Sequence, residues 1–168
     1  MELGKIVSTA SLYARNTQVD RVEGATQKPV ERLQKSVDSA KVQLSALGQV
    51  KSATAQVETA AATLQDKTKL SNVDDVQKAV QNFANAINAE QNTLRQTTRN
   101  DNRGATGALA NETRVRAAAQ ETKQAVQGRN GANESALRQI GVTFNATGEM
   151  KVDTKKLEQA FKANPNQV

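Results

Sequence analysis

The sequence predicts a mainly α protein: an antiparallel helical bundle with one long coiled-coil-like helix and a small β-hairpin near the C-terminus. Apolar residues recur at intervals of three and four over most of the chain, which is the period of an α-helix. Aromatic residues make up only 2% of the chain and hydrophobic residues 37%, so a core has to be built from Ala, Val and Leu where helices touch. One short stretch near the C-terminus alternates apolar and polar residues instead, which is typical of strands.

Two segments with different patterns divide the 168 residues. Residues 1–28 show weak periodicity and many Ser, Thr, Asn and Gln residues, so we expect a flexible N-terminal arm there. Three interpretations of this arm stay open: an unordered terminus, an uncleaved export signal, and a segment that becomes ordered on assembly. Residues 29–165 are expected to form one helical domain.

The long helix is expected over residues 29–66. Pro29 fits the first helical turn, where a missing N–H group leaves no hydrogen bond unmade. After Gly48 the apolar pattern shifts by one residue, which indicates that the surface in contact with the helix changes there. At 1.5 Å per residue the helix measures about 55 Å, so it should extend beyond a compact domain. Its apolar seam comprises Val30, Leu33, Val37, Ala40, Leu44 and Leu47, followed by Val50, Ala53, Val57, Ala60 and Leu64.

Two further helices are expected after a polar connection at residues 66–71, which is short enough to bring the chain back antiparallel. The first covers residues 72–98, with Ser71 and Asp74 forming its N-terminal cap. The second covers residues 112–127 and is stopped by a glycine. The apolar face of the first comprises Val73, Val76, Val80, Phe83, Ile87 and Leu94.

A β-hairpin is expected at residues 142–152, where Gly148 supplies the positive φ of the turn. Asp153 is placed to cap a last helix at residues 154–163. Because an isolated hairpin is only marginally stable in water, it has to pack on the helices.

The composition excludes several classes of chemistry. Cysteine and histidine are both absent, which removes Ser-His-Asp and Cys-His nucleophile systems and zinc sites built on thiolate or imidazole ligands. Asp74 and Asp75 are adjacent acids, but no third ligand lies near them in sequence, and the first turn of a helix favours negative charge. We therefore expect a protein that is not an enzyme, with no catalytic, cofactor-binding or metal site.

The net charge is +6, and residues 95–129 carry seven bases against three acids. A basic helical protein that binds polyanions is thus one alternative. No aromatic residues interleave these bases for stacking, so nucleic acid is not expected as a partner. No apolar run reaches the roughly 18 residues of a membrane span, and no secretory signal pattern is found, so neither a membrane nor a cleaved leader is expected.

The C-terminal region carries a resemblance to a known family. Residues 137–153, with the sequence LRQIGVTFNATGEMKVD, are followed by Lys156-Leu157 and by Ala163-Asn164-Pro165. This order closely resembles the end of bacterial flagellar filament cap proteins, also called hook-associated protein 2. The stretches 28–34 and 44–53 resemble the first helix of the same family, and residues 107–109 together with 113–116 resemble its central helical part.

Two departures from the family are visible. Family members carry a large, mostly β head after the first helix, whereas the short connection at residues 66–71 stands in that place here. Residues 1–27 also match the family's opening poorly. The resemblance therefore implies a short form that consists of the helical leg.

The resemblance implies a structural and assembly protein of the flagellum, similar to the cap that sits at the distal end and promotes flagellin polymerisation. It implies an extracellular location reached without a cleaved signal peptide, a homo-oligomer, and flagellin or other flagellar axial proteins as partners, with an export chaperone as a further candidate. A cytosolic adaptor derived from the cap, which binds a chaperone or flagellin, is the alternative. The expected self-association and filament-contact residues are Leu33, Val37, Leu44, Leu47, Val50 and Val57.

Overall fold

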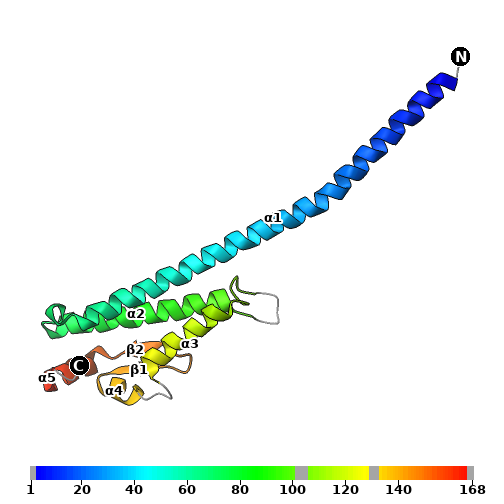
Figure 1. Ribbon diagram of the computed structural model, residues 1–168. Helices are drawn as coiled ribbons and strands as arrows, with labels where there is room; N and C mark the ends of the chain where they lie inside the picture. Colours follow the sequence, from blue (N-terminus) through cyan, green and yellow to red (C-terminus); the bar gives the residue numbers. More distant parts are fainter. Residues whose placement is uncertain (1–2, 101–105, 129–132, 166–168) are drawn as a thin grey trace. The chain divides into compact units, whose positions relative to one another are not determined.

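The computed structural model describes residues 3–100, 106–128 and 133–165, with side chains described from residue 27 onward. The described residues form mainly helices and one two-stranded antiparallel sheet (Figure 1). The predicted fold class is confirmed. The chain divides into two units, residues 1–42 and residues 43–168, and each is described by itself.

The first unit is formed by the helix α1 (Leu3–Gln65), which continues into the second unit. The expected helix start at Pro29 is wrong, because α1 begins at Leu3 and carries this proline in its interior. A proline inside a helix removes one backbone hydrogen bond. Once a helix has formed, however, each residue added to it makes a further hydrogen bond, so the helix can continue on both sides of the proline. Residues 1–28 are therefore not separate from the long helix where the structure describes them.

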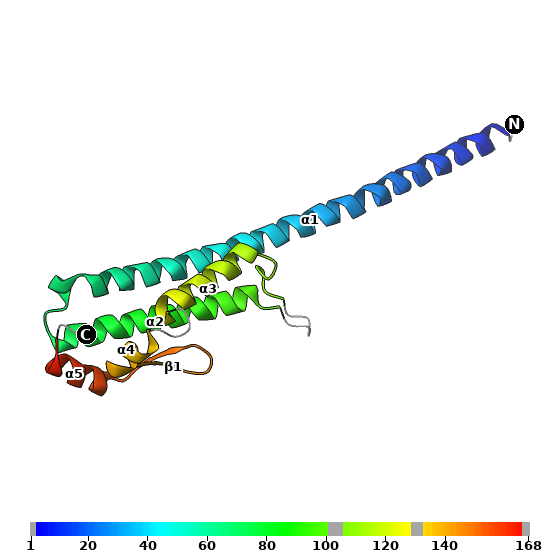
Figure 2. The same ribbon diagram turned by 60° about the horizontal axis from the view of Figure 1, so that its bottom comes forward.

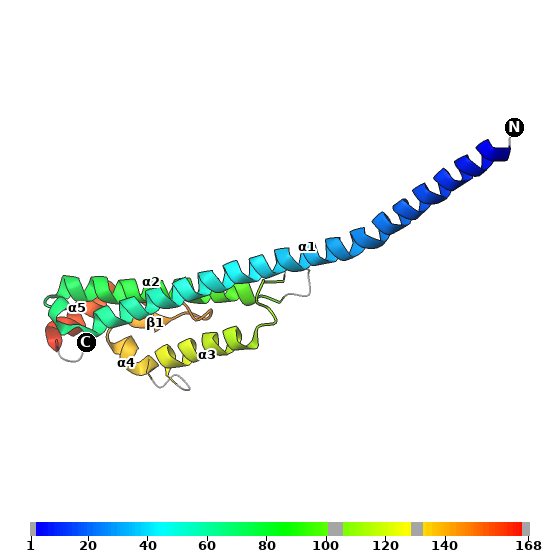
Figure 3. The same ribbon diagram turned by 45° about the horizontal axis from the view of Figure 1, so that its top comes forward.

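The second unit contains the rest of α1, which pairs antiparallel with α2 (Val73–Thr98) (Figures 1 and 3). The short 3-10 helix η1 (Lys67–Lys69) connects them, and Asp66 caps it by accepting a hydrogen bond from the Thr68 backbone N–H at 3.1 Å. The expected cap of α2 is wrong by one residue. Asn72 is the N-cap, and its side-chain oxygen accepts from the Asp75 backbone N–H at 2.9 Å.

The helices α3 (Thr113–Gln127) and α4 (Glu134–Gln139) follow α2. α3 ends at Gly128, whose φ of 74° suits a residue without a side chain. Glu112 is the N-cap of α3, without a side-chain capping hydrogen bond.

The hairpin consists of β1 (Val142–Phe144) and β2 (Met150–Val152). Val142 pairs with Val152, and Phe144 with Met150. Gly148 has the expected positive φ, at 85°. Asp153 then caps α5 (Thr154–Ala163), because its Oδ1 accepts from the Lys156 backbone N–H at 3.1 Å.

The core of the second unit lies between α2, the hairpin and α5. Figures 1 and 2 show α2 between the second-unit part of α1 and the hairpin. One face of α2 therefore packs on the hairpin, and another packs on α1. The buried members of this core are Val76, Val80, Ala84, Val142, Met150 and Leu157.

Asn88 holds the hairpin against α2. Its Nδ2 donates to the Met150 carbonyl at 2.9 Å, and its Oδ1 accepts from the Met150 backbone N–H at 2.8 Å. Arg95, two turns further along α2, donates from Nη1 to the Thr147 carbonyl at 3.2 Å. These bonds satisfy backbone groups of the hairpin that its own pairing leaves free.

Candidate docking surface

Large apolar side chains are exposed along α1. In the first unit they are Val30, Leu33, Val37 and Val42, with exposed fractions of 62%, 67%, 48% and 59%. We name the first three, which follow each other at intervals of three and four residues, the first-unit stripe. In the second unit they are Leu44 and Leu47, at 72% and 43%. Soluble proteins seldom leave such residues together without a partner.

The other two residues of the expected surface lie differently. Val50 and Val57 are half-buried. They share a helical face with Ala46 and Ala53, which are 6% and 7% exposed. The structure therefore splits the expected set of six into four outward residues and two that belong to the packed face of α1.

The phase shift after Gly48 marks this division. The packed face recurs at Ala46, Val50, Ala53, Val57 and Ala60, all buried or half-buried, with alternating steps of four and three residues. The exposed face ends at Leu47, one residue out of phase with it. Ala46 belongs to the packed face, but the sequence pattern did not predict this. The larger apolar residues Leu44 and Leu47 lie beside it and were assigned to the apolar seam instead.

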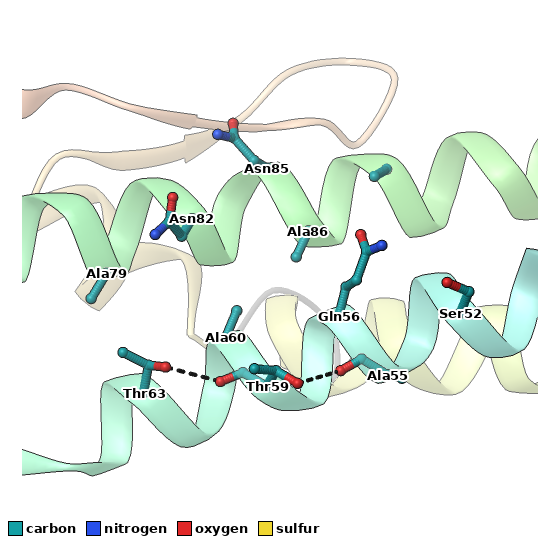
Figure 4. Close-up of a pocket in the computed structure, with 11 residues that line it drawn as sticks. Ser52, Ala55, Gln56, Thr59, Ala60, Thr63, Ala79, Asn82, Asn85 and Ala86 are labelled. Carbon is teal, nitrogen blue, oxygen red and sulfur yellow. Dashed lines mark hydrogen bonds between the residues drawn. The ribbon is translucent and has the colours of Figure 1, made fainter.

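A groove of about 640 Å³ runs between α1 and α2 within the second unit (Figure 4). Ala79 and Ala86 are buried in its floor, and Ala60 is half-buried beside them. No charged side chain lines this groove. Its remaining lining residues are Ser52, Ala55, Gln56, Thr59 and Thr63 on α1 and Asn82, Asn85 and Ala89 on α2.

Two rim hydroxyls of the groove are bonded within α1. Thr59 Oγ1 donates to the Ala55 carbonyl at 2.9 Å, and Thr63 Oγ1 donates to the Thr59 carbonyl at 3.0 Å (Figure 4). Threonine in a helix commonly bonds to the carbonyl four residues earlier. The groove therefore combines a floor of small apolar side chains with a rim of short polar ones.

Glu90 is a buried carboxylate in the contact between α1 and α2. The residue is 2% exposed, and its Oε1 accepts a hydrogen bond from Thr54 Oγ1 at 2.8 Å. Its Oε2 is buried without a hydrogen-bond partner. Burying Oε2 without a partner makes the contact between α1 and α2 less favourable. The hydrogen bond from Thr54 to Oε1 is the polar interaction of Glu90 that links the two helices.

Two bases of the basic stretch, Arg95 and Arg99, already interact with other groups in the part of the chain that is described. Arg95 is engaged by the hairpin and by Asn92, whose Oδ1 lies 2.6 Å from its Nη2. Arg103 and Arg129 lie outside the described residues. Within residues 3–100, 106–128 and 133–165, no cluster of three or more acidic side chains is arranged to hold a metal ion.

No described helix combines the length and the apolar character needed to cross a membrane.

Comparison with known families decides the relationship. The profile of the flagellar hook-associated protein 2 C-terminus matches residues 70–168, which is more than half of the chain. The chain belongs to the flagellar hook-associated protein 2 family. Neither a curated protein nor a solved structure matches the chain.

The family match divides the candidate surfaces. The α2 side of the groove lies inside the part matched to hook-associated protein 2, and the α1 side lies outside it. The exposed residues from Val30 to Leu47 also lie outside the match. The matched part thus contains α2, the hairpin and the core between them, and the exposed apolar residues precede it in the chain.

Proposed function

We propose that this protein is a non-enzymatic structural subunit of the bacterial flagellum that works at the distal end of the filament, in the manner of a filament cap, and assembles with further copies of itself. The observation that carries the proposal is the match of residues 70–168 to the hook-associated protein 2 C-terminus. The absence of histidine and cysteine from the sequence fits a role that depends on contacts rather than on catalysis.

The exposed apolar residues of α1 support self-association. Leu44 and Leu47 are leucines on one face of a helix, three residues apart, and both are exposed. Burial stabilises an association by about 25 cal/mol per Å² of apolar surface before the cost of ordering. A partner helix, supplied by another copy or by another axial protein, would remove this surface from water.

Location tests the function directly. We would label the protein with antibody on intact flagellated cells and find the label by electron microscopy. Label at filament tips supports a cap-like subunit outside the cell. Label confined to the cytoplasm contradicts the proposal and favours the alternative, a cytosolic adaptor for flagellin or for an export chaperone.

Self-association is tested with the double variant Leu44→Asp, Leu47→Asp. Both side chains are exposed, so helix α2 and the hairpin should remain folded by circular dichroism. We expect the oligomer mass measured by sedimentation to fall toward that of a single chain, because two charges would have to be buried at the contact. An unchanged mass would show that this pair takes no part in assembly.

A further inference from the structure

We propose that the first-unit stripe of one copy docks in the groove between α1 and α2 of a second copy. Each chain would then carry one donor surface, Val30, Leu33 and Val37, and one acceptor surface in the second unit. The inference rests on the self-association in the proposed function and names the two surfaces that meet. It differs from a coiled coil in which two stripes face each other.

The two surfaces complement each other in side-chain size. The donor carries large apolar side chains at intervals of three and four residues, all exposed. The acceptor has alanines on its floor, of which Ala79 and Ala86 are already buried. Helices pack by placing the side-chain ridges of one into the grooves of the other, and small residues let the backbones approach closely. A groove without large side chains therefore suits a helix that has them.

The surfaces also agree in length. The groove runs from Ser52 to Thr63 on α1, which is about 16 Å at 1.5 Å per residue. The donor face from Val30 to Ala40 covers about 15 Å on the same basis. Three helical turns of the donor would fill the groove.

The charges around the two surfaces are opposite in sign. Residues 28–42, around the donor, hold four bases and two acids. The two helix segments that line the groove, residues 52–63 and 79–89, hold one acid and no base. The acid is Glu58, which is exposed. The lining itself is uncharged, so attraction would act at the edges and no charge would have to be buried.

The donor has to come from another copy. The first-unit stripe and the α1 side of the groove both belong to the helix α1, and two stretches of one helix do not pack against each other. A donor surface and a different acceptor surface on each chain allow two arrangements. Two copies can exchange donors reciprocally in a two-fold dimer, or each copy can donate to the next in a heterologous contact, which closes into a ring or continues as a helical assembly according to the rotation between copies.

Cysteine crosslinking tests the inference in the full chain. The sequence contains no cysteine, so each introduced thiol is unique. We would mix Val37→Cys protein with differently tagged Ala89→Cys protein and oxidise mildly. We expect a mixed disulfide dimer at several times the yield obtained when Ala118→Cys, an exposed alanine on α3 outside the groove, replaces Ala89→Cys.

The outcomes separate this inference from the proposed function. If Val37→Cys protein crosslinks mainly to itself and not to Ala89→Cys protein, stripes face each other and the inference is overturned while self-association stands. If no pair crosslinks and sedimentation gives a single chain, both self-association and this inference fail.

A second variant tests the groove without crosslinking. The double change Ala55→Arg, Ala89→Arg fills the groove from two exposed positions, and arginine is a good helix former. We expect self-association to weaken at least tenfold, while Ala118→Arg leaves it unchanged. Equal association of both variants, with native circular dichroism, would overturn the inference.

Discussion

The helix of the first unit and the helix α2 of the second carry similar apolar patterns and bury them differently. Every described side chain from residue 27 to residue 42 is exposed. In α2, residues Val76, Val80, Ile87 and Leu94 are at most 9% exposed. The same spacing therefore predicts that a helix face needs a partner, but not whether the partner lies in the same chain.

Shortening a buried core leucine and an exposed leucine of α1 should give the largest difference in stability. Leu157 is fully buried against α2 and the hairpin, so Leu157→Ala should destabilise the fold by about 2–5 kcal/mol. Leu44 is 72% exposed, and Leu44→Ala should change stability by no more than about 0.5 kcal/mol at a concentration where the protein is a single chain. Urea unfolding followed by circular dichroism measures both. Equal losses would show that the two leucines have similar surroundings.

Two glycines extend the comparison. At Gly141 φ is 88°, and an added Cβ would lie 2.8 Å from the Asp153 carbonyl oxygen. Gly141→Ala should therefore destabilise the fold by at least about 1–3 kcal/mol. At Gly48, inside α1, no atom beyond its chain neighbours and the nearby backbone of its own helix lies within 4 Å of an added Cβ, and Gly48→Ala should stabilise by about 0.5–1 kcal/mol. The two urea midpoints should move in opposite directions, and a shift in the same direction would contradict this account.

The attachment of the hairpin to α2 gives a smaller effect. Asn88→Ala removes both hydrogen bonds to the Met150 backbone and leaves partly buried groups unpaired, so we expect a loss of about 1–2 kcal/mol. Asn85 is exposed one turn earlier, and Asn85→Ala serves as the control. Hydrogen exchange should locate the loss at β2. Unchanged protection of the Met150 amide would mean that Asn88 does not hold the hairpin.

The connection between α1 and α2 should give the smallest effect. The hydrogen bond from the Thr68 hydroxyl to Asp66 is the main cause that lowers the pKa of this carboxyl below its ordinary value of 3.8. Because the folded pKa lies below the unfolded one, the stabilisation is complete above the unfolded pKa and is lost as the pH falls through the folded pKa.

We therefore expect the stability difference between the natural chain and Asp66→Asn to shrink below about pH 4. Asparagine keeps an acceptor for Thr68 but does not titrate. Urea midpoints of both proteins between about pH 5 and pH 3 measure the difference. A constant difference over that range would show that ionisation of Asp66 does not contribute.

Much of the second unit could be predicted from local signals. The alternation at the hairpin, the glycine at its turn and the cap at Asp153 each act within a few residues, and the structure has all three. The start of α1 could not be predicted, because Pro29 is compatible both with a first turn and with a helix interior that gives up one bond.

The candidate surface could be predicted only in part. The apolar repeat identified Leu33, Val37, Leu44 and Leu47, which are exposed. It also included Val50 and Val57, because a repeat does not reveal which face turns toward α2. The groove could not be predicted, because it depends on which alanines of α1 and α2 face each other when the two helices pack. Alanine also contributes little to an apolar sequence pattern.

The bonding of Thr59 and Thr63 within α1 has a consequence for selectivity. Their hydroxyls are already engaged with backbone carbonyls, so these positions offer mainly methyl groups to a visiting helix. Discrimination there would depend on the volume and spacing of incoming side chains and not on matched donors and acceptors. A surface of this kind tolerates exchanges among valine, isoleucine and leucine. The two contacting sequences can therefore change during evolution while the contact between them is kept.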